Sequence, residues 1–187
     1  MDFQSLLKNR RSIRDFQDRR VPREVIEEIV RDTRLAPSAS NRQPCRLIVI
    51  RNREWIKRLS DESKRNLLDD LDRNPDLPLK QYETTLRNGQ FNVFYNAPCL
   101  IYVIGPRNLF SLDVDCGLMV AYLMFSATSR GLGTCWIGLG AHIRDRQILE
   151  ELGVPDDCRI VAPIILGYPA NIPSVSERLI PEIIKVI

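Results

Sequence analysis

Three arginines and a serine stand close together near the start of the chain, and their chemistry suits an anion. The segment reads Arg10-Arg11-Ser12-Ile13-Arg14 and is followed by an aromatic residue at Phe16. A guanidinium group can bind phosphate through two parallel hydrogen bonds, and a serine hydroxyl can donate to the same oxygens. The segment therefore predicts an anion-binding turn, although a solvated basic turn remains the alternative when the segment is taken alone.

A second polar segment lies between two prolines and reads Ala36-Pro37-Ser38-Ala39-Ser40-Asn41-Arg42-Gln43-Pro44. Its serine and amide side chains both donate and accept hydrogen bonds, which suits a ligand-facing loop. An ordinary connection between a helix and a strand explains the same composition. Taken alone, that simpler interpretation is favoured.

Several familiar sites lack their residues. No glycine-rich turn of the dinucleotide-binding type follows a strand, because the glycines at 131, 133, 138 and 140 have the wrong spacing and follow a helical segment. There is no phosphate-binding P-loop and no serine nucleophile elbow, and a single histidine, His142, weakens any catalytic triad. The five cysteines include no CxxC pair, so we expect no metal site and no disulfide framework, but reduced and mostly buried thiols.

A long apolar helix is predicted over residues 111–130, and it must position the segments around it. It is apolar on every side from Leu118 to Phe125, so we expect protein to wrap it almost completely. Ser111 is the expected N-cap, and Gly131 the residue that ends the last turn. Residues 132–138 follow as a short strand that ends at Gly138, where a backbone could approach a flat ligand closely.

The remaining pattern predicts three further core strands and several amphipathic helices. The strands are expected at residues 45–50, 99–104 and 159–166, and the helices at 2–9, 22–35, 53–72 and 145–152. Residues 79–96 show no clear pattern and are either a cover over a site or a plain surface helix. The apolar tail, residues 174–187, is expected to need a partner surface.

Composition limits the class of protein. The chain has 187 residues, of which 44% are hydrophobic and 27% charged, so we expect one globular domain spanning residues 1–187. The net charge of +3, without a dense basic run, favours a small anionic ligand over nucleic acid. The N-terminus lacks the apolar core of a signal peptide, and no window approaches a membrane span, so we expect a cytoplasmic protein that does not enter membranes.

Taken together, these segments resemble the FMN-dependent nitroreductase family. The matching pieces are residues 10–16 (RRSIRDF), 36–44 (APSASNRQP), 131–138 (GLGTCWIG), 167–169 (GYP) and Arg178. They appear in the family's order and extend over nearly the whole chain. Each motif alone is weak to moderate, but the combination is specific.

The resemblance implies an α+β fold with a mixed central β-sheet flanked by helices, in an intertwined homodimer that binds FMN at its interface. It implies an oxidoreductase that transfers hydride from NAD(P)H through the flavin to a nitroaromatic, quinone or similar acceptor, by a ping-pong scheme. The flavin would carry the chemistry, so no catalytic side chain is expected. A flavin-binding or sensing protein without turnover is the main alternative, and a structural interaction module is a third.

The resemblance also implies a role for each matching residue. Arg10, Ser12 and Arg178 would hold the phosphate with help from Arg11, and Arg14 would lie beside the pyrimidine edge of the flavin. A fixed cation there would favour the reduced, negatively charged ring. Pro37, Ser38, Ala39 and Asn41 would reach the flavin from the partner subunit, with Gln43 close by. Trp136, Ile137, Gly138 and Leu139 would lie under one ring face, where a backbone amide can bond N5, and Gln90 would lie near the pyrimidine.

Overall fold

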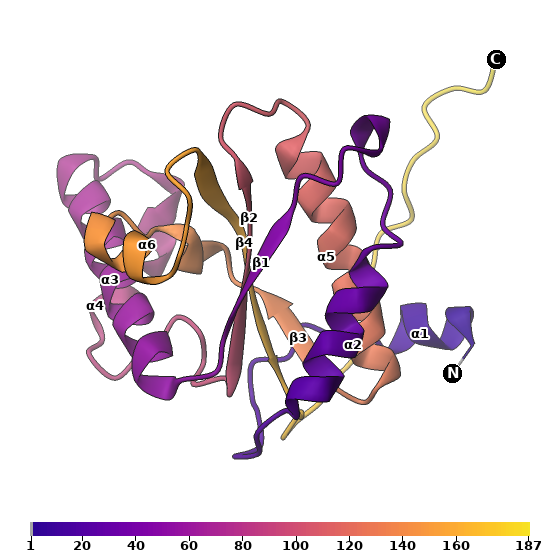
Figure 1. Ribbon diagram of the computed structural model, residues 1–187, viewed down its shortest axis with the longest axis horizontal. Helices are drawn as coiled ribbons and strands as arrows, with labels where there is room; N and C mark the ends of the chain where they lie inside the picture. The colour runs from indigo at the N-terminus through magenta and orange to yellow at the C-terminus, as the bar shows by residue number, and fades with distance from the viewer. Residues whose placement is uncertain (1) are drawn as a thin grey trace.

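The computed structural model describes residues 2–187, and within them a four-stranded sheet separates two layers of helices (Figure 1). The strands are β1 (Arg46–Ile50), β2 (Cys99–Pro106), β3 (Gly133–Trp136) and β4 (Cys158–Gly167), in the order β1-β2-β4-β3. Each neighbouring pair is antiparallel. The parallel element of the expected mixed sheet is an isolated bridge between Ser12 and Thr134. All four predicted strands are confirmed.

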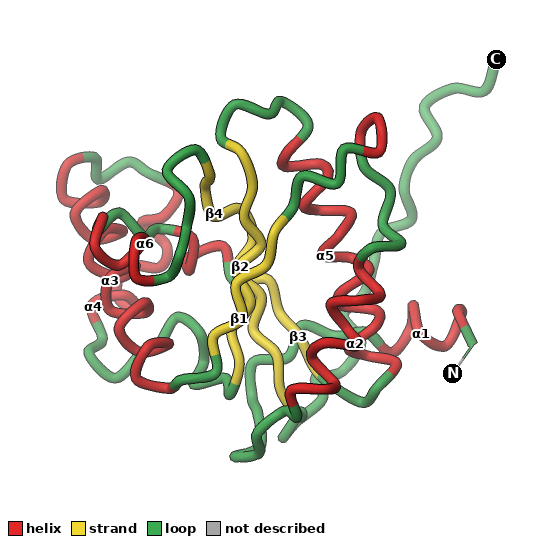
Figure 2. The backbone as a smooth tube through the Cα atoms, in the orientation of Figure 1, coloured by secondary structure: helices red, strands yellow, loops and turns green. Residues whose placement is uncertain are grey.

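The helices cover both faces of this sheet, which Figure 2 shows nearly edge-on. They are α1 (Phe3–Asn9), α2 (Arg23–Thr33), α3 (Arg53–Arg73), α4 (Glu83–Arg87), α5 (Leu112–Ser129) and α6 (Arg146–Glu151), with short 3₁₀ turns η1 (Ala39–Asn41), η2 (Pro78–Tyr82) and η3 (Gly138–Ala141). The helices α3, α4 and α6 lie on one side of the sheet, and α2 and α5 lie on the other (Figure 1). Residues 79–96, which had no readable pattern, contain most of η2 and all of α4.

The central strands β2 and β4 are apolar along most of their length because both of their faces are buried. In β2, Leu100, Tyr102 and Ile104 pack toward the α3 layer. The alternating residues Ile101 and Val103 pack toward α5 and α2. This period of two in a strand covered on both sides explains why the sequence reads as a continuous hydrophobic run.

The ends of α5 follow the expected chemistry at one terminus but not at the other. Gly131 has φ of 73°, its amide donates to Thr128 O, and the Leu132 amide donates to Ala127 O. A glycine in this left-handed backbone conformation is a common way to end an α-helix. Ser111 is the N-cap residue, as predicted, but its side chain makes no capping bond to a backbone amide. Its hydroxyl instead donates to the Asp115 carboxylate at 2.9 Å.

One face of α5 is open to solvent in the single chain, contrary to the expectation of nearly complete wrapping. Val114, Leu118 and Tyr122 are 66%, 38% and 41% exposed. Residues spaced by four lie on one helical face, so these three form a continuous apolar stripe. The C-terminal tail is equally uncovered: from Ile172 onward it forms no helix or strand and runs away from the sheet (Figure 1).

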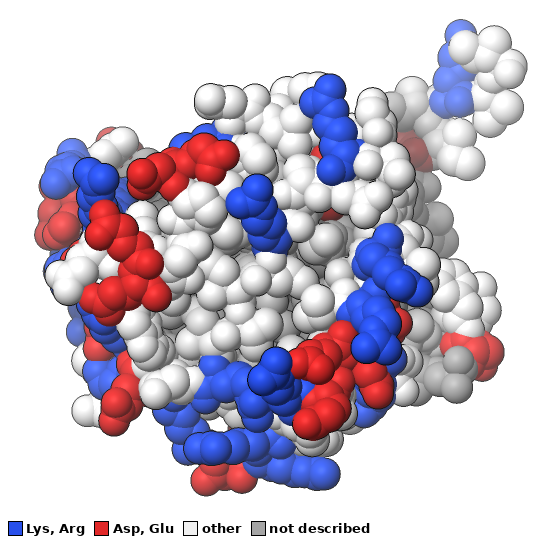
Figure 3. All heavy atoms as spheres, in the orientation of Figure 1, with Lys and Arg blue, Asp and Glu red and all other residues white. Residues whose placement is uncertain are grey.

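Charge on the molecular surface is mixed. On the face shown in Figure 3, acidic and basic side chains are interspersed around a mostly uncharged centre. Many charged side chains of the described residues pair locally, as in Arg144 with Asp70 and Arg146 with Glu150. This face therefore offers no continuous basic surface.

Gly133 is required by the close approach of the N-terminal arm to β3. A Cβ at this position would lie 2.4 Å from Ile13 Cγ1 and 2.7 Å from its Cβ. Ile13 is only 3% exposed, so it has little room to move. We expect Gly133→Ala to lower the free energy of unfolding by about 1–3 kcal/mol, because overpacking a buried contact strains its neighbours.

Denaturant titration of purified protein would measure this effect, with Gly89→Ala as the matched control. A Cβ at Gly89 meets nothing within 4 Å, so a change within about 0.5 kcal/mol is expected there. Equal stability of Gly133→Ala and the wild type would contradict the packing described for Ile13.

Candidate functional site

The arginine-rich turn lies directly against strand β3. Ser12 pairs with Thr134 in the isolated parallel bridge, and the Ile13 amide donates to Thr134 O at 2.9 Å. Burial raises the pKa of the Cys135 thiol, whereas Arg14, a hydrogen bond with Ser12, and Arg10 oppose that rise. The backbone contacts with Thr134 therefore hold the basic turn directly beside β3.

Beyond the end of β3 the chain lines a cavity of about 330 Å³. Its lining residues are Arg14, Tyr82, Val93, Tyr95, Trp136, Ile137, Gly138 and Leu139. This cavity, hereafter the Arg14 cavity, brings together Arg14 and the four residues predicted to lie under a flat ligand. Its volume lies within the range of about 300–1,000 Å³ that is usual for small-molecule sites.

One backbone amide that lines the Arg14 cavity already has a hydrogen-bond partner within the chain. Ile137 is only 5% exposed, and its amide donates to Pro163 O at 2.8 Å. That amide is therefore not available to a ligand. The amides of Gly138 and Leu139 are left as candidates, and Gly138 has open space where a Cβ would stand.

Two tyrosines in the Arg14 cavity were missed by sequence reasoning. The Arg14 guanidinium carbon lies 5.7 Å from the centroid of the Tyr95 ring, within cation–π range. Tyr82, at the end of η2, is 43% exposed. Both belong to the unreadable stretch 79–96, where scattered aromatic residues were the available signal. The contact of Tyr82 with this cavity agrees with the interpretation of that stretch as a cover.

Helix α3 holds the two loops that frame the Arg14 cavity. Two bonds hold the loop before β2: Ser60 Oγ accepts from Val93 N at 3.0 Å, and Lys64 Nζ donates to Phe91 O at 2.8 Å. A third holds the segment after β3, where Ser63 Oγ donates to Leu139 O. These three α3 residues are buried. A buried donor without a partner costs about 1–3 kcal/mol, so these bonds fix the backbone of both loops.

The proline-bounded loop, residues 36–44, lies at the other end of α5. The Ala39 amide donates to Asp115 Oδ1 at 2.8 Å, and Asp115 is in the first turn of α5. Within the loop, Ser38 Oγ accepts from Gln43 N at 3.0 Å, and Asn41 Oδ1 accepts from Gln43 Nε2 at 3.0 Å. Asp115 is only 2% exposed, and it anchors the loop.

A single chain therefore separates the predicted site residues into two groups. The loop that contains Pro37, Ser38, Ala39 and Asn41 is held by Asp115, and Pro37 and Ser38 line a cavity together with Asp115. Arg14 and Trp136–Leu139 line the Arg14 cavity instead. The two groups therefore line different cavities of the single chain, and these cavities have no lining residue in common.

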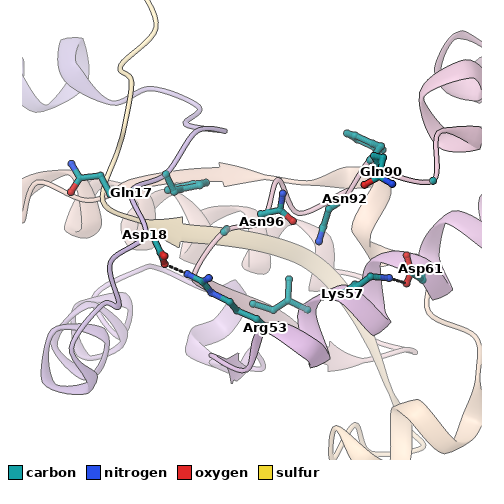
Figure 4. A pocket seen from close by; sticks show the side chains of 13 residues that line it. Gln17, Asp18, Arg53, Lys57, Asp61, Gln90, Asn92 and Asn96 are labelled. Carbon is teal, nitrogen blue, oxygen red and sulfur yellow. Dashed lines mark hydrogen bonds and ion pairs between the residues drawn. The ribbon is translucent and has the colours of Figure 1, made fainter.

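Two further predicted residues lie apart from the Arg14 cavity. Gln90 lines a different cavity of about 600 Å³, together with Arg53, Lys57 and Asn96 (Figure 4). Arg178 lies in the exposed tail. The start of that tail is nonetheless fixed beside the arginine turn, because the Ala170 amide donates to Asp15 O at 3.0 Å.

One arginine of the turn carries an unsatisfied donor. Within residues 2–187, Arg11 Nη2 is buried and has no hydrogen-bond partner. Native proteins rarely leave a buried guanidinium nitrogen unpaired, so such an atom calls for an explanation. In the same part of the chain, no group of three or more His, Cys, Asp or Glu side chains is arranged to hold a metal ion.

These features define a protein in which an antiparallel sheet between two helical layers presents a basic turn beside a small open cavity. A family model described as the nitroreductase family matches residues 7–168. The chain belongs to the nitroreductase family and has its fold.

Similar proteins agree with this assignment. A protein of Archaeoglobus fulgidus, provisionally named an NADH dehydrogenase/NAD(P)H nitroreductase, is 29% identical over 172 residues, which is 89% of this chain and 84% of that protein. A chloronitrobenzene nitroreductase of Comamonas testosteroni is 28% identical over 205 residues, covering 92% and 88%. A solved nitroreductase with bound FMN from Bacteroides fragilis superposes with a TM-score of 0.83 at 22% identity, covering 100% of this chain and 99% of that one.

The helices in residues 2–187 are all too short or too polar to cross a lipid bilayer.

The anchoring role of Asp115 can be tested without any ligand. Replacing Asp115 by Asn removes the charge that accepts from the Ala39 amide and the Ser111 hydroxyl. We expect a loss of about 1–3 kcal/mol of unfolding free energy and faster hydrogen exchange at the Ala39 amide. Asp113→Asn is the control, because Asp113 is mostly exposed and pairs at the surface with Arg159, so its loss is expected to stay below about 1 kcal/mol. Unchanged exchange at Ala39 in the Asp115 variant would refute the anchor.

Proposed function

We propose that this protein is an FMN-dependent oxidoreductase that uses NAD(P)H to reduce nitroaromatic, quinone or similar acceptors. The observation that carries the proposal is the Ser12–Thr134 bridge, which places the basic turn against the strand leading into the Arg14 cavity. Family membership and relatives named as nitroreductases support it. When bound, FMN would supply the hydride transfer between donor and acceptor.

The residues of the site fit this cofactor. The buried, unpaired Arg11 Nη2 is a donor that a phosphate group could satisfy. Arg10 and Ser12 lie on the same turn and would bind the phosphate, and Arg14 would place positive charge beside the ring system. Trp136, Gly138 and Leu139 would form the surface beneath the ring. Nitroreductases solved with bound FMN share this fold, including one from Desulfitobacterium hafniense at 24% identity and a TM-score of 0.77.

We further propose that the active form is a homodimer built on α5. Two α5 helices packed antiparallel about a two-fold axis would place the N-terminal end of one beside the C-terminal end of the other. The loop 36–44 of one subunit would then meet the Arg14 cavity of its partner, which reunites the two separated groups. The exposed stripe of Val114, Leu118 and Tyr122 supplies an apolar surface for that contact, and the apolar tail supplies a second one.

Flavin binding is tested by adding FMN to the purified protein, removing free flavin, and measuring the flavin absorbance that remains. Arg10→Ala and Arg178→Ala should each weaken FMN binding by about 1.5–3 kcal/mol, or roughly ten- to 150-fold in Kd, since each removes a charged phosphate contact. Riboflavin lacks the phosphate, so its affinity should be unchanged by either substitution. Arg146→Ala, at an exposed site on α6, is the control.

A protein that retains no FMN would refute the proposal. If FMN binds but NADH and NADPH are not oxidised with any nitroaromatic or quinone acceptor, the protein is a flavin binder without turnover. Arginine variants that bind FMN as tightly as the wild type would assign the turn to the solvated surface.

The dimer is tested by Leu118→Arg, which places a charge in the exposed stripe of α5. We expect a monomer in sedimentation experiments at concentrations where the wild type is a dimer, together with loss of FMN binding, because each site would need both subunits. Gln147→Arg, on α6 at the opposite side of the sheet, should leave both properties unchanged. A monomeric wild type that binds FMN would overturn this part of the proposal, and circular dichroism would show whether the variant still folds.

A further inference from the structure

Two thiols face each other beneath the proline-bounded loop. Cys45 follows Pro44 at the end of the loop, Cys116 lies in α5, and their sulfur atoms are 3.2 Å apart. The five cysteines, all within the described residues, are free. Two of the others have different neighbours, since Cys135 donates to the Trp136 carbonyl and Cys158 to the Asp157 carboxylate. The contact between Cys45 and Cys116 joins residues 71 positions apart in sequence.

One member of this pair is accessible and the other is not. Cys45 is half-buried and lines a cavity of about 390 Å³, together with Ser38, Gln43 and Asp115. Cys116 is completely buried. A small reagent would therefore reach the Cys45 sulfur first and find the Cys116 sulfur directly behind it.

The electrostatics of the pair assign the same order of reaction. The hydrogen bond from Cys116 lowers the pKa of Cys45, against the opposing effects of burial and of the Asp115 charge. The same hydrogen bond, with burial, raises the pKa of Cys116. The thiolate is the nucleophilic form of cysteine. Cys45 is therefore the attacking thiol, and Cys116 remains protonated until a second step.

We propose that Cys45 and Cys116 form a reversible intramolecular disulfide when the protein meets hydrogen peroxide or an organic hydroperoxide. The Cys45 thiolate attacks the O–O bond, which gives a sulfenic acid at Cys45 and releases water or an alcohol. The Cys116 sulfur then attacks the sulfenic sulfur, forms the S–S bond and displaces water. Overall, two thiols lose two electrons and two protons, and the hydroperoxide is reduced.

The disulfide would fasten the loop to α5 at both ends. Asp115 already holds the loop through the Ala39 amide. Its sequence neighbour Cys116 would hold Cys45 covalently. A closure of about 1 Å brings the two sulfur atoms to bonding distance, a movement that the end of a loop can accommodate. Oxidation would thereby restrain the segment proposed above to reach the partner's flavin site, although formation of the bond does not depend on that proposal.

The test uses the full chain, first reduced and freed of reductant, then treated with hydrogen peroxide at stoichiometric to roughly tenfold excess. Remaining thiols are alkylated, and the digest is mapped by mass spectrometry without reduction. The expected result is a linked pair of peptides containing Cys45 and Cys116, the loss of two of the five thiols, and their recovery with dithiothreitol. The oxidised protein should also unfold at a higher temperature than the reduced protein, because a cross-link restricts the unfolded chain.

Matched variants separate the two steps. In Cys116→Ser, the Cys45 sulfenic acid should persist and be trapped by dimedone. In Cys45→Ser, Cys116 should stay reduced, and Cys158→Ser should form the disulfide as the wild type does. One result that would overturn the proposal is alkylation of both Cys45 and Cys116 in the wild type, after the same peroxide treatment that gives the trapped sulfenic acid in Cys116→Ser. Linked peptides that come from two different chains would also overturn it. Because the product is scored by mass in flavin-free protein, this result stands or fails separately from flavin binding.

Discussion

Helix α5 is the element on which the arrangement of the predicted site residues depends. The helix holds the loop 36–44 at one end through Asp115, and at the other end it leads through Gly131 into β3 and the Arg14 cavity. The cavity beside the loop and the Arg14 cavity have no lining residue in common, so a ligand that needs both groups would have to obtain one of them from a second chain, as proposed above. The apolar stripe along the same helix is what a second copy would cover. Under the proposed dimer, the composition of the site and the assembly of the protein would both follow from this one helix.

The sequence was sufficient to predict the sheet because burial on both faces leaves a strong signal. Strands such as β2 and β4 are apolar along most of their length, so they could be located from the sequence pattern alone, although their exact ends could not. The helix α5 was equally visible, since it is apolar all round. The exposed face of α5 could not be predicted, because the hydrophobic pattern does not show whether a helix is covered by its own chain or by another. Likewise, Ser111 has the right residue type for an N-cap, but the buried Asp115 carboxylate competes for its hydroxyl.

The candidate site was predictable where residue chemistry is distinctive, and not where geometry decides. Arg14 and Trp136–Leu139 do line one cavity, and Ser12 does lie beside β3. Sequence gave no means of finding Asp115, which acts through a contact with Ala39 that spans 76 positions. It also could not show that the Ile137 amide is already bonded to Pro163. The roles of Arg178 and Gln90 still rest on resemblance, since a single chain leaves one in the tail and the other in a separate cavity.

Backbone strain is concentrated in the two segments that the proposed ligand would touch. Within residues 2–187, the non-glycine residues with positive φ are Ser40, Asn41, Gln43, Tyr95 and Asn96. Each such residue costs on the order of 1–3 kcal/mol and persists only where its surroundings hold it in place. Asp115 supplies that restraint for the first segment, and the buried donors and acceptors of α3 supply it for the second. A loop that only connects a helix to a strand has no reason to accumulate this strain. Its presence in both segments favours a role in shaping a ligand site over the simpler interpretation that the sequence alone had favoured for the loop 36–44.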